Sequence, residues 1–177
     1  RLKKQNNFQK KQTAVKIINE IKKLDIDGDI AVYLEVLGAN YHKAPIIGMG
    51  IYNDKLSYFI PLEVLKQNPQ FLLKNIKYTY DLKKMIVSLK YQNIEMDNVV
   101  FDTMIAGSLL DYNIKDDMSY LANELDYELE FYENIYGKNN HLKMPEIDII
   151  AKETVARAKF IWETRDFFKS KIKEENL

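Results

Sequence analysis

The residues best suited to chemistry lie on one apolar, β-branched stretch, Ile30-Ala31-Val32-Tyr33-Leu34-Glu35-Val36. In a strand, alternate side chains share a face, so Tyr33 and Glu35 should project together while Leu34 points to the opposite face. A carboxylate is an oxygen ligand of the kind that hard divalent cations such as Mg²⁺ bind. The chemistry to look for is therefore carboxylate chemistry, centred on Glu35.

Other catalytic chemistries lack their residues. The chain has no cysteine and no Gly-x-Ser-x-Gly motif, which excludes thiolate zinc sites and disfavours nucleophilic catalysis. The two histidines, His42 and His141, fall in loops, where we expect surface residues. Close backbone packing explains the Gly-Met-Gly of residues 48–50 better than a phosphate-binding loop does. Residues 25–29 resemble the start of an EF-hand, but the twelfth position is Val36 instead of Glu, so we predict a turn.

Length and charge restrict the class of protein. A chain of 177 residues fits one domain that buries about two thirds of its unfolded surface. The formal net charge is zero, from 26 basic and 26 acidic residues, so the domain lacks the positive field of an autonomous nucleic-acid binder. Apolar runs fall far short of the roughly 20 residues that cross a bilayer, so no membrane contact is expected. Without cysteine or a leader, we expect a cytoplasmic protein.

Residues 1–24 are predicted to form a basic linker and an amphipathic helix that lead into the domain at residues 25–177. Up to residue 23 the single acid is Glu20, and we interpret the surrounding lysines as a solvated face. The helix is predicted from apolar residues at helical spacing, namely Ala14, Ile17, Ile18 and Ile21. Because the chain begins with Arg1 instead of Met, we expect a fragment of a longer polypeptide.

Beyond residue 25, the pattern predicts antiparallel opening strands and then strand–helix alternation. The opening strands are expected over 30–36, 46–52 and 56–60, with Asn53-Asp54 as a hairpin turn. Later strands are expected at 76–80 and 99–101, and helices at 62–67, 70–74, 82–89, 103–110, 116–125 and 127–136, with the longest helix after Pro145. We therefore predict an α/β fold, a mixed sheet flanked by helices on both faces.

Five motifs in register give the chain a resemblance to a known family. They are residues 41–48, Phe101-Asp102-Thr103-Met104, Ser108-Leu109-Leu110-Asp111, residues 116–122 and Ile135-Tyr136-Gly137-Lys138. In order and spacing they resemble the 3′-5′ exonuclease domain of bacterial DNA polymerase I, family A, and most closely the degenerate version found in Bacillus-type polymerases. The resemblance covers roughly residues 29–162 and implies a ribonuclease H-like fold.

The resemblance also implies where metal ligands would lie. In family members with an intact site, a strand Asp-x-Glu, a mid-chain Asp and a late helical Tyr-x-x-x-Asp hold two divalent metals, Mg²⁺ or Mn²⁺. Carried across by register, these positions fall on Tyr33, Glu35, Met85, Glu153 and Arg157. A thioether does not replace a carboxylate for magnesium, and the cation of Arg157 repels a metal. We therefore expect a degenerate site, with no catalytic residue, cofactor or metal in this domain.

A hypothesis about this site follows from the same register. If Glu35 and Arg157 face one another as the family ligands do, they form an ion pair in place of a metal. Tyr33 and Met85 would then fill the cleft with apolar bulk. The alternative is that all four are ordinary surface or core residues.

The predicted function is that of a catalytically inactive 3′-5′ exonuclease-like structural domain of a DNA polymerase I that takes part in DNA replication and repair. Polymerase chemistry would lie elsewhere in a parent DNA-directed DNA polymerase, a nucleotidyltransferase that binds the DNA. The expected partners are the polymerase domain and the 5′ nuclease domain of the same chain, in a monomer.

Two alternatives remain open. The first is an active metal-dependent 3′-5′ exonuclease that uses Glu35, Asp81 and Asp102 in an altered carboxylate site, although Asp102 is better explained as a helix cap. The second is a free-standing single-strand-binding module that uses its tyrosines as stacking platforms. The neutral net charge argues against the second.

Overall fold

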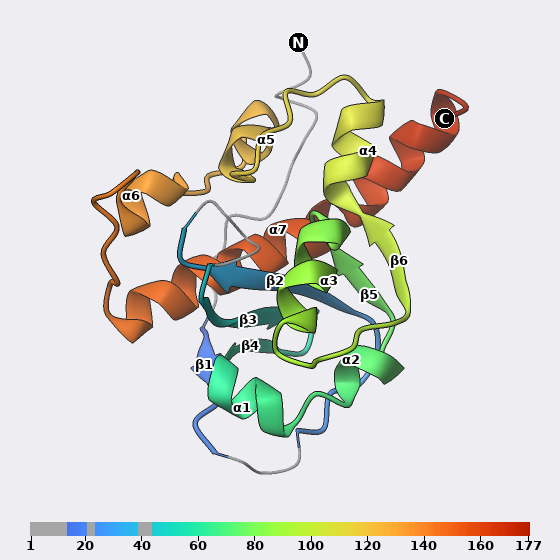
Figure 1. The fold of residues 1–177 in the computed structure, drawn as a ribbon. Coiled ribbons are helices and arrows are strands. Elements are labelled where there is room, and N and C mark those ends of the chain that lie inside the picture. The colour runs from blue at the N-terminus through green and yellow to red at the C-terminus, as the bar shows by residue number, and fades with distance from the viewer. Residues whose placement is uncertain (1–13, 21–23, 39–43) are drawn as a thin grey trace.

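The chain folds around one mixed sheet with helices on both faces. The structure, a computed structural model, describes residues 14–20, 24–38 and 44–177. Within these residues the sheet has six strands in the order β1-β4-β3-β2-β5-β6 (Figure 1). The predicted α/β architecture is confirmed.

Most element boundaries agree with the predicted ranges to within two residues. The strands are β1 (Lys16–Ile17), β2 (Ile30–Val36), β3 (Ile46–Tyr52), β4 (Ser57–Pro61), β5 (Lys77–Thr79) and β6 (Val99–Asp102). The helices are α1 (Leu62–Gln67), α2 (Phe71–Lys74), α3 (Leu82–Lys90), α4 (Thr103–Leu109), α5 (Ser119–Glu124), α6 (Tyr132–Tyr136) and α7 (Ile147–Glu174).

The opening strands pair antiparallel, and the later ones pair parallel. Strand β3 lies between β2 and β4 in an antiparallel ladder, while β5 pairs parallel with both β2 and β6. The predicted turn after β3 is present: the Asn53 side-chain oxygen accepts hydrogen bonds from the backbone N–H groups of Lys55 and Leu56. Strand β2 therefore lies inside the sheet, with the longest helix across its face.

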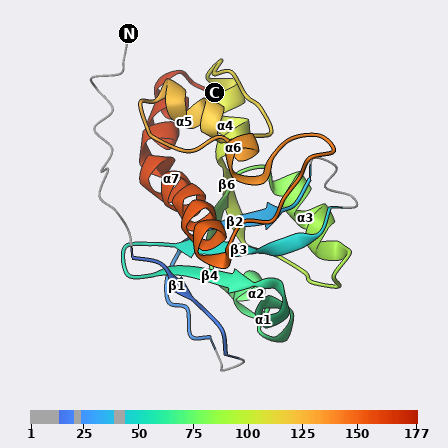
Figure 2. The same cartoon turned by 90° about the vertical axis from the view of Figure 1, so that its left-hand side faces the viewer.

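The two faces of the sheet bury different cores. One core contains Leu34 and Met85 and lies on the side of α1, α2 and α3. The other contains Tyr33 and lies against α7 and α5 (Figure 2). The predicted alternation along β2 is confirmed, because Tyr33 and Leu34 belong to different cores.

The helix predicted around residues 14–21 is wrong where the structure describes it. Residues 16–17 form strand β1, which pairs parallel with β4 at the edge of the sheet. Val15 and Ile17 pack on one core and Ile18 on another, so the apolar residues alternate with a period of two. The basic linker predicted within residues 1–24 falls mostly on residues 1–13 and 21–23, which, like His42, lie outside the described residues.

Two predicted helices are shorter than expected. Helix α5 begins only at Ser119, whose backbone N–H donates to the Asp117 carboxylate. The predicted helix over 127–136 is helical only in α6, because Tyr127 and Leu129 are buried while Glu128 and Glu130 are exposed. Alternating burial is the pattern of an extended segment.

None of the helices in the described part of the chain is long and apolar enough to span a bilayer.

Candidate functional site

Two glycines of β3 allow close packing of their neighbours. Gly48 and Gly50 lie opposite Glu35 and Tyr33 in the antiparallel ladder. A Cβ on Gly50 would lie 2.7 Å from the backbone oxygen of Thr154 in α7, and one on Gly48 would lie 2.6 Å from the backbone oxygen of Ile60 in β4. The predicted close-packing role of these glycines is confirmed. Gly50 is the one that lets α7 approach the face of β2 that carries Tyr33 and Glu35.

Glu35 is almost completely buried, with 1% of its surface exposed. Two hydroxyls face it: Thr154 Oγ1 lies 3.5 Å from Oε2, and the Tyr136 hydroxyl lies close enough to act as a hydrogen-bond donor to the carboxyl group. Burial raises the pKa of Glu35 above its ordinary value, although the charge of Arg157 acts in the opposite direction. A carboxyl group in this setting is stabilised in its neutral form.

The Thr154 hydroxyl has one proton to donate. Its oxygen lies 2.6 Å from the Ile150 carbonyl oxygen of the preceding turn, which is the shorter of its two contacts. Since the proton serves Ile150, the Thr154 oxygen faces Glu35 with its lone pairs. That arrangement suits a protonated Glu35 that donates to Thr154, and it agrees with the raised pKa.

Arg157 lies on α7 and is also 1% exposed. Its Nη2 donates to the Glu130 carbonyl oxygen at 2.5 Å, and its Nη1 donates to the Glu153 carbonyl oxygen at 3.0 Å. The Glu153 carboxylate lies 3.8 Å from Nη1. The guanidinium thus ties α7 to the extended segment before α6, with backbone oxygens as its main partners.

The predicted ion pair between Glu35 and Arg157 is not formed. Among the ion pairs of the described residues, the partner of Arg157 is Glu153, one helical turn earlier on α7. Burial acts to lower the pKa of Arg157, but the neighbouring acidic groups, Glu35 first, raise it overall. The two side chains are neighbours, but the guanidinium donates its hydrogens to the Glu130 and Glu153 carbonyls.

Helix α6 closes the same end of the sheet with two tyrosines. The Tyr132 hydroxyl donates to the Val36 carbonyl at 2.6 Å and accepts from the Gly38 N–H at 2.9 Å. Burial raises the pKa of Tyr132 to about 12. The buried Tyr136 hydroxyl has no contact of good hydrogen-bond geometry, yet it lies close to the Glu35 carboxyl. Burial, then the charge and the looser hydrogen-bond contact of Glu35, raise the pKa of Tyr136.

Asp117 anchors the start of α6 in turn. One carboxylate oxygen accepts from the Tyr132 N–H at 2.8 Å, and the other accepts from the backbone N–H and the hydroxyl of Ser119. These anchors, together with Glu130, are functional parts of the site that the sequence did not indicate. The alternation of Tyr127-Glu128-Leu129-Glu130 was the available signal, since it marks an extended segment.

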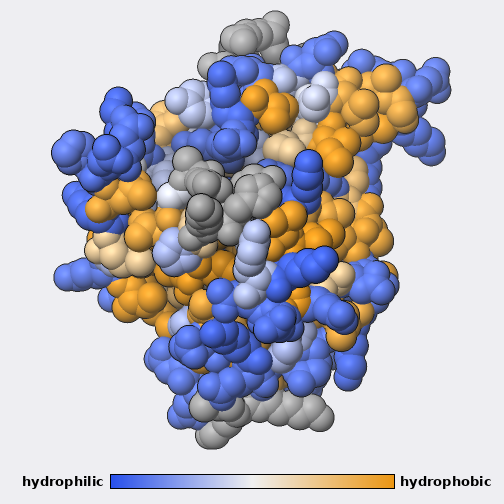
Figure 3. All heavy atoms as spheres, viewed as in Figure 1, coloured by the Kyte–Doolittle hydropathy of each residue, from blue (hydrophilic) through white to orange (hydrophobic). Residues whose placement is uncertain are grey.

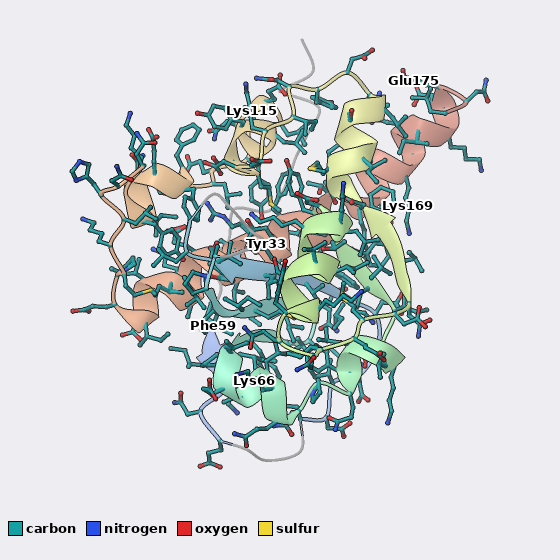
Figure 4. All side chains as sticks on the ribbon, viewed as in Figure 1. Tyr33, Phe59, Lys66, Lys115, Lys169 and Glu175 are labelled. Atoms are coloured by element: carbon teal, nitrogen blue, oxygen red, sulfur yellow. The ribbon has the colours of Figure 1, made fainter. Side chains whose placement is uncertain are left out.

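Tyr33 and Met85 line one small pocket, together with Leu34, Tyr80, Asp81, Lys84 and Asp116. Figure 4 places Tyr33 near the middle of the molecule, on β2. Burial, and then the charge of Glu35, raises the pKa of Tyr33 well above its ordinary value. Met85 is 2% exposed and accepts a contact from the Thr79 hydroxyl at 3.7 Å. Four of the predicted positions, with Glu153 beside Arg157, therefore gather in one region.

Asp81 and Asp102 form a separate junction at the N-termini of α3 and α4. The Asp102 carboxylate accepts three backbone N–H groups, those of Asp81 and Met104 at 2.9 Å and that of Leu82 at 2.8 Å. Asp81 caps α3 by accepting the Lys84 N–H at 3.2 Å. The predicted cap at Asp102 is confirmed, and it extends to both helices.

The donor set does not fit the two divalent metals that the family resemblance implies. The described residues contain no group of three or more His, Cys, Asp or Glu side chains that could hold a metal ion. The charged groups that act on Glu35 are the cations of Arg157 and Lys84 and a single carboxylate, that of Asp117. Tyr33 and Met85, at two of the implied ligand positions, offer a phenol and a thioether, which do not replace a carboxylate for a hard cation.

Sequence comparison identifies relatives over most of the chain. Residues 32–164 match the family model described as DNA polymerase I, ribonuclease H-like domain. The DNA polymerase I of Geobacillus stearothermophilus is 34% identical over 139 residues, which is 75% of this chain and 16% of the relative. That of Bacillus subtilis (strain 168) is 30% identical over 156 residues, 80% of this chain and 18% of the relative. The chain therefore spans less than a fifth of the length of these relatives.

Solved structures share the fold at low identity. Brucella melitensis NrnC has a TM-score of 0.66 and 14% identity, covering 92% of this chain and 81% of NrnC. Escherichia coli RNase D, an exoribonuclease involved in structured RNA processing, has a TM-score of 0.63 and 10% identity, covering 84% of this chain and 40% of RNase D. The fold is thus that of ribonuclease H-like exonucleases.

Proposed function

The chain belongs to the family of DNA polymerase I ribonuclease H-like domains, and we propose that it is a catalytically inactive, 3′-5′ exonuclease-like structural domain of a DNA polymerase I. It serves DNA replication and repair as part of that larger enzyme. The other parts of the enzyme, a polymerase domain and a 5′ nuclease domain, are its partners in a monomeric, cytoplasmic chain, and DNA is bound through the parent polymerase.

The observation that carries the proposal is the buried guanidinium of Arg157. It occupies the position that the family pattern gives to a metal carboxylate, and it is held by the Glu130 and Glu153 carbonyls. A fixed positive charge beside Glu35 disfavours any divalent cation there. With Tyr33 and Met85 at two further ligand positions, the site is degenerate in a concerted way.

A domain that has lost catalysis can still have a structural role in the parent enzyme. Arg157, Tyr132 and Asp117 join α7, α6 and β2 at the end of the sheet where Glu35 lies. These contacts close that end with hydrogen bonds that require no metal. We infer that the domain is retained as a rigid scaffold that positions its neighbours.

The test is a nuclease assay on the longest polypeptide that the source gene encodes. Primers with mismatched 3′ ends are incubated with Mg²⁺ or Mn²⁺, and the expected result is no metal-dependent excision above the level without metal. The Glu35→Ala variant should behave like the parent. Its control is Asp166→Ala, which removes an exposed acid of helix α7 instead of the buried acid of β2.

Excision that requires metal and disappears in Glu35→Ala, but not in Asp166→Ala, would overturn the proposal. It would instead support an active exonuclease with an altered carboxylate site.

A further inference from the structure

Helix α4 turns an apolar stripe outward. Ile105 and Leu109 lie four residues apart, on one face of the helix, and are 54% and 49% exposed. The opposite face is buried through Thr103, Ala106 and Gly107. The fold of the domain therefore uses only one side of α4 and leaves two large apolar side chains unpacked.

Strand β6 extends this surface. Val100, in the strand directly before α4, is 54% exposed. Because β6 is last in the strand order, it pairs only with β5 within the described sheet, and its other edge is unpaired. Figure 3 shows hydrophobic residues along the flank of the molecule formed by α4 and β6. We call Val100, Ile105 and Leu109 the α4–β6 surface.

The end of α7 lies beside helix α4, which carries two residues of this surface. Helices α4 and α7 are in contact, and both ribbon views place the end marked C beside α4 (Figures 1 and 2). The curated relatives are single chains of which this chain covers 16–18%. A polypeptide that continues past Leu177 as in these relatives would emerge within reach of α4.

We propose that the α4–β6 surface is the docking face for the polymerase part of the parent chain. The inference rests on the proposed function, since it takes the domain to be a piece of a larger polymerase. The occupant presents an apolar face of its own. Contact between that face and Ile105, Leu109 and Val100 removes apolar surface from water, which favours docking. Covalent connection through α7 raises the local concentration of the occupant, so a modest apolar area is sufficient.

A second apolar group provides a matched control. Leu142, Met144, Ile147 and Ile149 are exposed around the start of α7, with Ile149 at 48%, almost equal to Leu109. The helix rises about 1.5 Å per residue, which puts Ile149 about 35 Å from Ile172 at the other end. The two apolar groups are therefore similarly exposed, but they differ in their distance from the end of α7.

The experiment measures thiol labelling in the longest polypeptide that the source gene encodes. The 177 residues contain no cysteine, so a single Leu109→Cys or Ile149→Cys substitution gives this domain one reactive thiol, which peptide mass spectrometry can follow. We expect Leu109→Cys to react at least tenfold more slowly than Ile149→Cys in the native chain. The two rates should become equal in denaturant. An Ile105→Cys variant should repeat the slow rate.

Equal labelling rates at positions 109 and 149 in the native chain would overturn the docking inference. Slow labelling of position 109 that becomes fast on dilution would also overturn it, because the occupant would then be a second copy of the chain. Neither result depends on nuclease activity, so this inference and the inactive site can fail separately.

Discussion

Asp102 and Glu35 are both acidic residues on strands of one sheet, yet they are satisfied in opposite ways. Asp102 receives three backbone N–H groups at 2.8–2.9 Å and so caps two helices at once. Within the described residues, Glu35 receives no backbone N–H; it faces the Thr154 hydroxyl at 3.5 Å and the Tyr136 hydroxyl, which makes no well-formed hydrogen bond. Asp102 is therefore explained by folding alone, whereas Glu35 is a buried acid whose partners are two weakly bonded hydroxyls.

The surroundings of Glu35 compensate by a different route. Arg157 supplies a nearby positive charge, but its hydrogens are directed at the Glu130 and Glu153 carbonyls. The guanidinium is therefore a tie between α7 and the segment before α6, and its effect on Glu35 is electrostatic. The comparison makes a testable claim: the Asp102 junction depends on hydrogen bonds to a carboxylate, and the Glu35 region depends on Arg157.

The largest effect is expected from Arg157→Ala. This variant empties a site that is 1% exposed and leaves the Glu130 carbonyl without its donor. Removing one member of a buried charged cluster costs about 3–5 kcal/mol of unfolding free energy. Urea denaturation followed by circular dichroism measures the change, and Arg157→Met, which keeps most of the volume, should lose less.

A loss of unfolding free energy below about 1 kcal/mol for Arg157→Ala, which is the range of an exposed ion pair, would contradict this contrast between Asp102 and Glu35. It would mean that the Glu35 region does not depend on its cation.

Asp102→Ala is expected to have the next largest effect. It leaves the first turns of α3 and α4 without a shared acceptor for three N–H groups. Loss of a cap costs about 0.5–2 kcal/mol per helix, so a loss of about 2–3 kcal/mol is expected. Urea denaturation measures this loss of unfolding free energy. The control is Glu95→Ala, which changes an exposed acid. Native stability in Asp102→Ala would contradict the double-cap role.

A pair of tyrosine variants sharpens the picture of the Glu35 region. Tyr132→Phe removes the hydroxyl that joins α6 to Val36 and Gly38, and should cost about 1–2 kcal/mol. Tyr136→Phe removes a buried hydroxyl whose contact with the Glu35 carboxyl lacks good hydrogen-bond geometry, and should cost less than about 1 kcal/mol. Thermal unfolding of both variants side by side provides the measurement. Equal losses would show that the Tyr136 hydroxyl is in fact satisfied in solution.

Local patterns predicted most of the fold. The apolar run of β2, the turn at Asn53 and the cap at Asp102 each depend on residues close in sequence, and each is confirmed. Residues 14–20 misled the helix prediction because their apolar spacing also fits a strand that packs on two cores. Pairing with β4, a contact distant in sequence, decided between the two.

The site divides in the same way. A family register brought Tyr33, Glu35, Met85 and Arg157 into one region, and the structure places them there. The direct ion pair was wrong because the orientation of Arg157 depends on the Glu130 carbonyl, a backbone group whose position no side-chain pattern records. The register was enough to predict that these side chains lie close together. Predicting the hydrogen bonds of Arg157 also required the backbone path of residues 127–131.

Glu35→Gln is expected to have the smallest effect of these variants on the free energy of unfolding when both proteins are compared at low pH. Burial raises the pKa of Glu35 above 4.5 in the folded state, so the folded protein holds a proton that the unfolded chain releases. The neutral form therefore contributes stability that is fully present below pH 4.5 and is lost as pH rises through the folded pKa. Glutamine mimics the neutral acid, and its amide N–H can donate to Thr154. We expect a change of at most about 1 kcal/mol below pH 4.5.

As pH rises, Glu35→Gln should become progressively more stable relative to the parent, because the parent must either ionise a buried carboxyl or take up a proton that the unfolded chain does not bind. The charged groups that face Glu35 are Arg157 on α7, Lys84 on α3 and Asp117 before α5, and all three are kept in the variant. Denaturation of both proteins from pH 4 to 8 isolates the contribution of Glu35. A difference that is flat with pH would mean that Arg157 holds Glu35 ionised despite its burial, and Glu35 would then resemble Asp102 in being a stabilised anion.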